Sequence, residues 1–165
     1  MSEAWTAWAA SQKLVVTPSE FTLQNATGVI DGVTCAMSIV KDSEGWTHTQ
    51  ATAEAVTPSA VWVAVFPNPF GVLDFVKAKL GEDLLVGDKP FDASYIIRAE
   101  PDEMAVAMLR ADIRARVTRM AGDGFEALTY DNGHVMLQWR GSESGPEVLT
   151  YALETVQLLA RWSPG

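Results

Sequence analysis

The side chains of this chain that could do acid–base or metal chemistry begin with its two histidines, His48 and His134. Neither has a second histidine or a cysteine at the spacing of an HxH or HxxxH metal motif. His134 follows a turn glycine, so we expect it at the exposed start of a strand. His48 lies in a strand pattern with Trp46 and Glu54 on the same face. The histidines therefore predict no metal site.

Nucleophilic and carboxylate chemistry rests on three further residues. Cys35 lies in an apolar strand pattern, where a thiol packs as a small hydrophobic side chain; a nucleophile pair with His48 is the catalytic alternative. Asp88 and Asp92 could form a carboxylate pair, but an aspartate before a tight turn commonly bonds its own backbone, which favours a turn and strand-entry role. No phosphate loop or dinucleotide motif is present. We predict no catalytic, cofactor-binding or metal-binding residue and favour a protein that is not an enzyme.

Length, composition and charge limit the class of protein to which this chain can belong. A length of 165 residues with 48% hydrophobic residues predicts a single domain over residues 1–165 with one core. The net charge of −9 argues against binding to a phosphate backbone. One cysteine excludes an intrachain disulfide. The sequence has no signal-peptide pattern and no run of about 18 apolar residues, so we expect a cytoplasmic protein without a membrane span.

The strongest local pattern is a strand followed by a long helix. Residues 91–98 have the aromatic and β-branched composition of a strand. Pro101, Asp102 and Glu103 then suit the first turn of a helix, and Gly122 suits its end. Apolar residues recur at spacings of three and four between these ends: Val106, Leu109, Ile113, Val117 and Met120. The pattern predicts one helix over about residues 102–121.

Arginines flank this apolar stripe on both sides. Arg110 and Arg114 fall on one flank, whereas Arg116 and Arg119 fall on the other, beside Asp112. We interpret them as two solvated borders with an Asp112–Arg116 pair rather than as a nucleic-acid face.

The remaining segments predict a strand-rich first part and a mixed second part. Asn132-Gly133 lies between two β-prone runs and predicts a two-residue turn with positive φ at both positions. The final helix has an apolar arc so wide that it predicts two packing neighbours. We expect helices over residues 2–13, 72–80 and 146–162, and strands over residues 21–24, 27–30, 33–40, 46–56, 59–66, 125–130 and 135–140.

This order of elements favours an α+β fold. Residues 1–87 form the strand-rich part with a short helix, and residues 88–165 add a strand, a helix, a hairpin and a helix. We expect a mostly antiparallel sheet with the two long helices, about 102–121 and 146–162, packed on one face. Short N-terminal and middle helices complete the prediction.

A family pattern is present in the middle of the chain. It consists of Gly87-Asp88-Lys89-Pro90-Phe91-Asp92, then Tyr95-Ile96-Ile97, and then Ala105, Leu109 and Arg110. It resembles uncharacterised bacterial proteins with a loose "GD…F(D/E)…F.V" strand, followed by a helix with "A…L". The resemblance covers about thirty residues. It implies a bacterial origin and a strand followed by a helix, and it implies no activity or cofactor.

Two functions are compatible with these patterns. The first, which we favour, is a non-enzymatic interaction or accessory module that could form a homodimer or bind another protein. Its apolar surface would consist of Trp5, Trp8, Tyr151, Leu158 and Trp162. For Trp5 and Trp8 we favour docking on the chain's own sheet and keep the partner surface as the alternative. The second is a protein that binds a small molecule or an acyl ligand, enzymatic or not. Its cavity would lie between sheet and helices and be lined by Phe91, Trp62, Met136 and Trp139.

Overall fold

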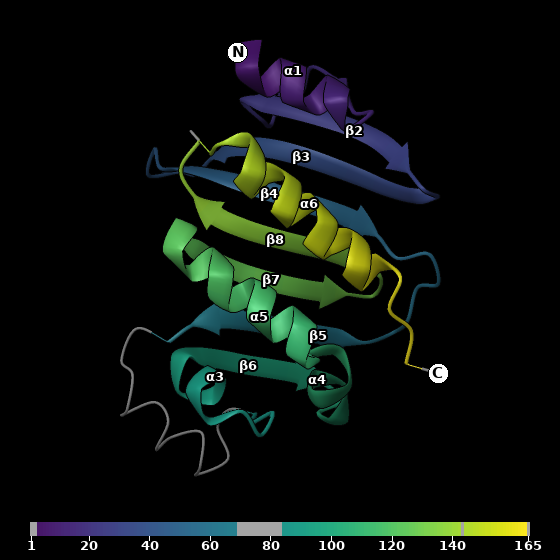
Figure 1. The fold of residues 1–165 in the computed structure, drawn as a ribbon, viewed down its shortest axis with the longest axis vertical. Coiled ribbons are helices and arrows are strands. Elements are labelled where there is room, and N and C mark those ends of the chain that lie inside the picture. Colours follow the sequence, from purple (N-terminus) through teal and green to yellow (C-terminus); the bar gives the residue numbers. More distant parts are fainter. Residues whose placement is uncertain (1–2, 69–83, 143, 165) are drawn as a thin grey trace.

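The computed structural model describes residues 3–68, 84–142 and 144–164 of the chain. Its centre is an eight-stranded sheet with the strand order β1-β2-β3-β4-β8-β7-β5-β6 (Figure 1). Every neighbouring pair of strands is antiparallel. The strands are β1 Val15–Val16, β2 Gln24–Ile30, β3 Val33–Lys41, β4 Thr47–Glu54, β5 Trp62–Pro67, β6 Tyr95–Glu100, β7 Phe125–Asp131 and β8 His134–Arg140.

Both parts of the sequence contribute to this one sheet. β7 and β8, from the second part, lie between β4 and β5, from the first part. β4 pairs with β8 along its length, from His48 opposite Arg140 to Glu54 opposite His134. The α+β class and the antiparallel sheet are therefore confirmed.

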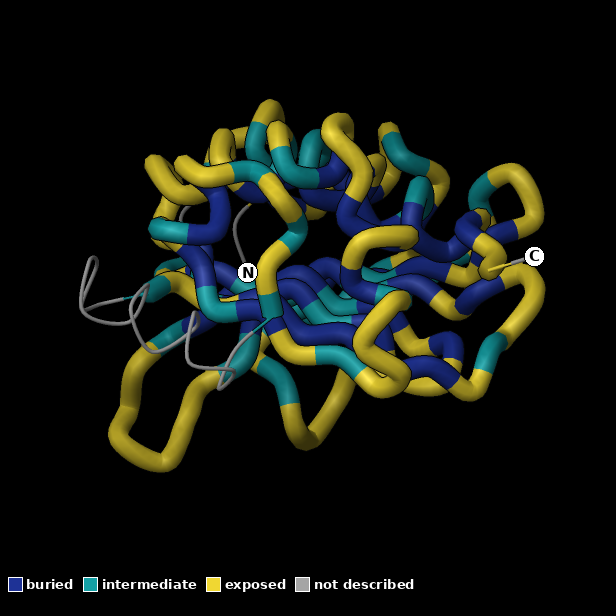
Figure 2. The backbone as a smooth tube through the Cα atoms, turned by 90° about the horizontal axis from the view of Figure 1, so that it is seen from below, coloured by how far each residue is buried: buried dark blue, intermediate teal, exposed yellow. Residues whose placement is uncertain are grey.

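The two faces of the sheet differ in what covers them. α1 (Glu3–Ser11), α5 (Ala111–Met120) and α6 (Pro146–Ala160) cross the same face (Figure 1). On β3, buried Val33, Cys35, Met37 and Ile39 alternate with the more exposed Thr34, Ala36, Ser38 and Val40. We call the first side the helix-covered face and the second the helix-free face. Figure 2 shows the strands mostly buried beneath the helices.

The N-terminal and C-terminal helices are docked on each other as well as on the sheet. Trp5, Trp8 and Ala9 are the buried residues of α1. The indole Nε1 of Trp8 donates a 2.9 Å hydrogen bond to the hydroxyl of Thr150 on α6. α6 packs on β3, β4 and β8, and its wide apolar arc follows from having these neighbours.

The long helix expected over residues 102–121 is wrong as a single element. The segment forms α4 (Glu103–Met108) and α5, joined at Leu109-Arg110, where Arg110 is extended. The break changes the phase of the apolar stripe: Leu109, Ile113, Val117 and Met120 are buried as expected, but Val106 is 56% exposed. The expected pair of long helices is therefore reduced to the C-terminal one, α6, and the shorter α5.

Arg114, in the first turns of α5, stabilises this break. Its Nη1 donates to the carbonyl of Leu109 at 2.6 Å, and its Nε donates to Asp88 Oδ2 at 3.0 Å. The guanidinium thus satisfies a backbone oxygen that a continuous helix would have bonded itself. The expected Asp112–Arg116 pair is also wrong, because Asp112 binds Arg110 and Arg116 reaches Glu154 on α6.

The segment expected as a strand over residues 91–98 begins as a helix instead. Residues Lys89–Ser94 form α3, and β6 starts only at Tyr95. Asp88 caps α3 by accepting a hydrogen bond from the Phe91 amide at 3.2 Å. The buried Asp92 accepts from the amides of Val86 and Gly87 at 2.9 and 3.0 Å. The two aspartates therefore serve the backbone, as capping and turn residues.

The turns follow the sequence more closely. Asn132 and Gly133 have φ values of 50° and 94°, which confirms the predicted turn between β7 and β8. α5 ends through a short 3-10 turn, and the left-handed residue is Gly124 rather than Gly122. The strand expected over residues 27–30 is part of β2, which begins at Gln24, whereas the separate strand expected over residues 21–24 is wrong because residues 21–23 lie in a turn and bend. The helix expected over residues 72–80 lies outside the described residues.

Within the described ranges, no helix has the length and apolar character needed to cross a membrane.

Candidate functional site

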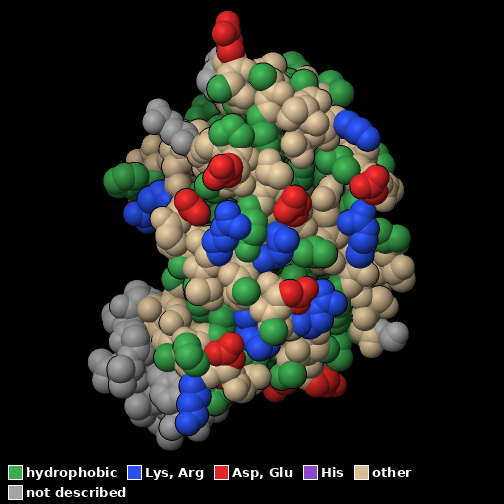
Figure 3. All heavy atoms as spheres, in the orientation of Figure 1, with side chains coloured by type: hydrophobic (Ala, Val, Ile, Leu, Met, Phe, Trp, Pro, Cys, Tyr) green, Lys and Arg blue, Asp and Glu red, His purple; other side chains and the backbone are tan. Residues whose placement is uncertain are grey.

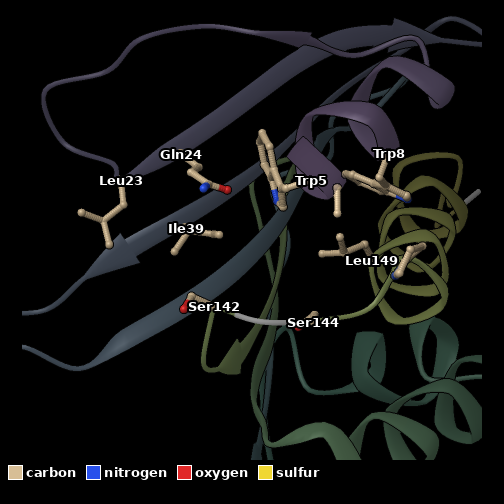
Figure 4. A pocket seen from close by; sticks show the side chains of 10 residues that line it. Trp5, Trp8, Leu23, Gln24, Ile39, Ser142, Ser144 and Leu149 are labelled. Carbon is tan, nitrogen blue, oxygen red and sulfur yellow. The ribbon is translucent and has the colours of Figure 1, made fainter. Parts of the chain in front are cut away.

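A cavity among the described residues lies on the helix-covered face, between α1, the start of α6 and the ends of β2 and β3 (Figure 4). Its volume is about 570 Å³, within the range of about 300–1,000 Å³ typical of small-molecule sites. The lining residues are Ala4, Trp5, Trp8, Leu23, Gln24, Ile39, Ser142, Ser144, Pro146 and Leu149. We call this cavity the α1–α6 pocket.

Two tryptophans of α1 form the upper wall of the pocket. Trp5 and Trp8 lie one turn apart, so both rings project from the same side of the helix, with centroids 6.4 Å apart. The Trp8–Thr150 hydrogen bond fixes this wall to α6. Ile39 and Leu149 face the indoles from β3 and α6 (Figure 4). The result is a wall of large, rigid apolar surfaces.

The opposite wall is the loop between β8 and α6. The fully buried Trp139 lies at the end of β8, and its Nε1 donates to the hydroxyl of Ser144 at 2.7 Å. Thr49 reaches the same loop by donating to the carbonyl of Gly141 at 2.7 Å. These bonds position the hydroxyls of Ser142 and Ser144 at the edge of the apolar wall.

The polar side chains among the described lining residues of the pocket are uncharged. Its described lining contains tryptophan, aliphatic, serine and glutamine side chains and no acidic, basic or histidine side chain. Gln24 lies on the helix-covered side of β2, and its Oε1 is buried without a hydrogen-bond partner among the described atoms. The pocket is thus apolar on one side and neutral but hydrogen-bonding on the other.

A second pocket of about 510 Å³ adjoins the first through Ser142 and Ser144. Thr47, Asp123 and Arg140 give it a polar lining. A molecule lying across both pockets would have apolar surroundings at one end and polar surroundings at the other.

The four residues expected to line one cavity are not brought together. Trp62 and Met136 lie on the helix-free face, since each pairs in register with residues of that face. Trp139 is fully buried on the opposite face, beneath the β8–α6 loop. Phe91 lies on α3 beyond the far edge of the sheet, where its ring stacks with Tyr95 at 4.5 Å. Side chains alternate between the two faces along a strand, so Trp62 and Met136 lie on one face of the sheet and Trp139 lies on the other.

The five residues expected as a partner surface are placed mainly inside the chain. Trp5 and Trp8 are 4% and 5% exposed, which corresponds to docking on the chain's own sheet. Trp162 is buried against Tyr130, with ring centroids 5.5 Å apart. Tyr151 and Leu158 are half-buried against the core. These residues do not form one exposed apolar surface.

Charged side chains cover the outer side of α5 and α6. Figure 3 shows basic and acidic groups mixed over this face. The guanidinium carbons of Arg116 and Arg119 lie 4.5 and 4.0 Å from the ring centre of Tyr151. The arginines therefore pack on an aromatic ring and pair with neighbouring acids, in place of forming a continuous basic stripe.

His48 is the centre of an ion cluster on the helix-free face. Its Nε2 lies 2.8 Å from Asp42 Oδ2 and its Nδ1 lies 2.6 Å from Glu126 Oε1. Glu126 is the extra residue of a bulge in β7, between the register positions of Phe125 and Ala127, and the bulge turns its side chain toward His48. A neutral imidazole carries one N–H, so only the charged ring can donate to both carboxylates. With both nitrogens bonded, His48 joins three segments of the fold and does not offer a metal ligand or a general base.

These contacts set the direction of two pKa shifts. Hydrogen bonds to Asp42 and Glu126 raise the pKa of His48 above its ordinary value of 6.5. The hydrogen bond from His48 lowers the pKa of Asp42. A raised histidine pKa means that the folded state holds the proton more tightly than the unfolded state.

We expect the stability contributed by His48 to be fully present below about pH 6.5 and lost as the pH rises through its folded-state pKa. The difference in free energy of unfolding between wild type and His48→Gln, from urea melts, should be larger at about pH 6 than at about pH 9. A difference that grows with rising pH, or a midpoint below the ordinary histidine value in a proton NMR titration, would contradict the charged cluster.

The other two candidate residues, His134 and Cys35, lie in surroundings that explain them by the fold alone. His134 lies at the exposed start of β8 and its Nδ1 is 2.7 Å from Glu54. Cys35 is buried on the helix-covered face, whereas His48 lies on the helix-free face. The two therefore do not form a nucleophile pair. Burial raises the pKa of the Cys35 thiol. Within the described ranges, no group of three or more histidine, cysteine, aspartate or glutamate side chains could hold a metal ion.

Sequence reasoning missed most residues of the α1–α6 pocket. Trp5 and Trp8 were singled out as side chains that dock on the chain's own sheet or form a partner surface, and not as a wall of a pocket. One signal for the site was available: Gln24 shares its strand face with Ala26 and Gly28, which places a polar side chain on the buried side of β2. Ser142 and Ser144 carry no pattern of their own, because loop hydroxyls are common.

Comparison with protein-family models gave no match, and neither did comparison with curated protein sequences. Among solved structures, the fold is similar to the crystal structure of the mycobacterial trehalose monomycolate transport factor A, with a TM-score of 0.66. The similarity covers 95% of this chain and 90% of that chain at 11% sequence identity. At this identity the likeness shows a shared fold.

Proposed function

We propose that this protein binds a small amphiphilic molecule and holds its acyl chain in the α1–α6 pocket. The observation that carries the proposal is the shape and chemistry of that pocket. Two indoles and the side chains of Ile39 and Leu149 offer a rigid apolar wall beside neutral hydrogen-bonding groups. An acyl chain gains about 0.8 kcal/mol for each methylene group that it buries on such a wall.

Binding fits the lining better than catalysis does. The described lining has no titratable side chain, so it supplies no general acid, general base or charged nucleophile. Its polar groups can orient a ligand but cannot move a proton at neutral pH. The proposal is accordingly a carrier or binding protein.

The shared fold supports this choice among the candidate functions. The structural neighbour is named as a trehalose monomycolate transport factor. The interaction module, favoured from the sequence, rested on the lack of a catalytic residue set and on apolar surface beyond the needs of one core. Trp5 and Trp8, expected as part of that surface, are buried in the chain. We therefore favour ligand binding.

A variant that fills the pocket tests the proposal. Ala4 lines the pocket from α1 and is itself exposed, so Ala4→Phe should place a ring in the cavity without disturbing the core. We expect methyl octanoate to quench or shift tryptophan fluorescence of the wild type. The variant should bind about tenfold more weakly, a loss of about 1.4 kcal/mol.

Ala10→Phe is the matched control, because Ala10 is also exposed on α1 but does not line the pocket. It should bind like wild type. Absence of binding to the wild type, or an equal loss in both variants, would refute the assignment of this pocket.

A further inference from the structure

We propose that the α1–α6 pocket selects an uncharged acyl ligand that carries a hydroxyl group. In this proposal the amide oxygen of Gln24 accepts a hydrogen bond from that hydroxyl. This inference rests on the proposed function and defines its ligand class. A glycerol or sugar ester of a fatty acid has this chemistry, whereas a free fatty acid does not.

The first observation is the buried amide oxygen of Gln24. The side chain projects from β2 into the pocket with its amide directed toward Trp5 (Figure 4). Its Oε1 is buried and accepts no hydrogen bond from the described residues. Leaving a buried acceptor without a partner is unfavourable, and native proteins rarely do so away from functional sites. Because this oxygen has almost no accessible surface, the amide has to turn toward the cavity for a ligand hydroxyl to supply the missing donor.

The second observation is the lack of charge in the described lining. A carboxylate that enters this pocket loses its hydration and meets no cation among the described lining residues, since Arg140 lines the adjoining pocket. A neutral ester keeps the same acyl chain without this penalty. The described lining therefore favours the neutral ester over the free acid.

The serines on the far wall complete the polar end of the site. Ser144 accepts its hydrogen bond from Trp139, so its own hydroxyl hydrogen is not used in that bond. Ser142 stands beside it on the same loop. An ester carbonyl or a second hydroxyl of the ligand can accept from these groups while Gln24 accepts from the ligand.

Three ligands with the same acyl chain separate the effect of the hydroxyl donor from the effect of charge: 1-octanoylglycerol, methyl octanoate and octanoate. Their binding is measured by calorimetry, with each ligand below its micelle concentration. The glycerol ester has hydroxyl donors, the methyl ester has none, and the acid is charged. We expect the wild type to prefer the glycerol ester over the methyl ester by about 3–10-fold, the value of one hydrogen bond. Octanoate should bind most weakly.

Gln24→Met keeps the length of the side chain and removes the acceptor. We expect it to abolish the preference for the glycerol ester over the methyl ester. Gln50→Met on the helix-free face is the control and should keep the preference. Equal wild-type affinities for the two esters, tightest binding of octanoate, or a preference that survives Gln24→Met would overturn the inference while leaving the acyl pocket in place. If none of the three ligands binds, the proposed function fails together with it.

Discussion

Leu109→Ala is expected to lower the free energy of unfolding by about 2–5 kcal/mol, the range for removing a fully buried leucine side chain. Leu109 is 0% exposed at the break between α4 and α5. Its carbonyl also accepts the hydrogen bond from Arg114 that stabilises this break. The cavity would therefore open where the backbone has little freedom to close it. Urea or guanidinium melts of the two proteins measure the difference.

Val106→Ala is the control for this prediction. Val106 belongs to the same sequence stripe but is 56% exposed, and exposed substitutions usually change stability by about 0.5 kcal/mol or less. A large loss in Val106→Ala would mean that residues 102–121 form one continuous helix with the stripe buried. A loss below about 0.5 kcal/mol in Leu109→Ala would mean that the residue is not in the core.

Gly133→Val should destabilise the protein by about 2–5 kcal/mol, because two costs combine. Gly133 has a φ of +94°, a conformation that a β-branched residue adopts only with strain. A Cβ built on Gly133 would also lie 2.8 Å from the Cβ of Pro58. The turn is held against that segment, since the amide of Ala55 donates to the Gly133 carbonyl at 2.7 Å. Thermal or denaturant melts report the loss.

Gly32→Val separates the two costs. Gly32 lies in the equivalent turn between β2 and β3 with a φ of +81°, but a Cβ there would have no neighbour within 4 Å. Only the backbone strain applies, which we expect to cost about 1–2 kcal/mol. If the two variants lose equal stability, the contact with Pro58 contributes nothing and the packing of the β7–β8 turn is not as described.

The parts of the fold that the sequence predicted are those encoded by neighbouring residues. Asn132-Gly133 determines its turn because few other dipeptides accept two positive φ values. The alternation in residues 33–40 and 46–56 marks β3 and β4, because one face of each strand is buried. α6 is marked by Pro146 at its start and a long apolar arc.

The parts that the sequence did not predict depend on contacts between distant residues. Val106 and Leu109 fit one helical stripe, and nothing local shows that Arg114 and Asp88 support a break between them. Residues 91–94 have a strand-like composition, yet the Asp88 cap and the buried Asp92 hold them as a helix. Local propensity was overridden in both segments by hydrogen bonds of the Asp88, Asp92 and Arg114 side chains.

The site was harder to predict than the fold for the same reason. The α1–α6 pocket takes its walls from α1, from the ends of β2 and β3, and from a loop more than one hundred residues further along the chain. Trp5 and Trp8 could be recognised as large apolar side chains, but what they face is set by the sheet order and by the docking of α6. A cavity expected from aromatic residues alone placed Trp62 and Trp139 together, although the sheet separates them.

The most direct measurement of the central claim is a proton–nitrogen NMR titration of the indole resonances with methyl octanoate. The six tryptophans lie in distinct places: Trp5 and Trp8 line the α1–α6 pocket, whereas Trp46 and Trp62 are partly exposed away from it. The account predicts that the Trp5 and Trp8 indole signals shift in a saturable way while those of Trp46 and Trp62 stay in place. Shifts at Trp62 or Trp46 with Trp5 and Trp8 unchanged would contradict it.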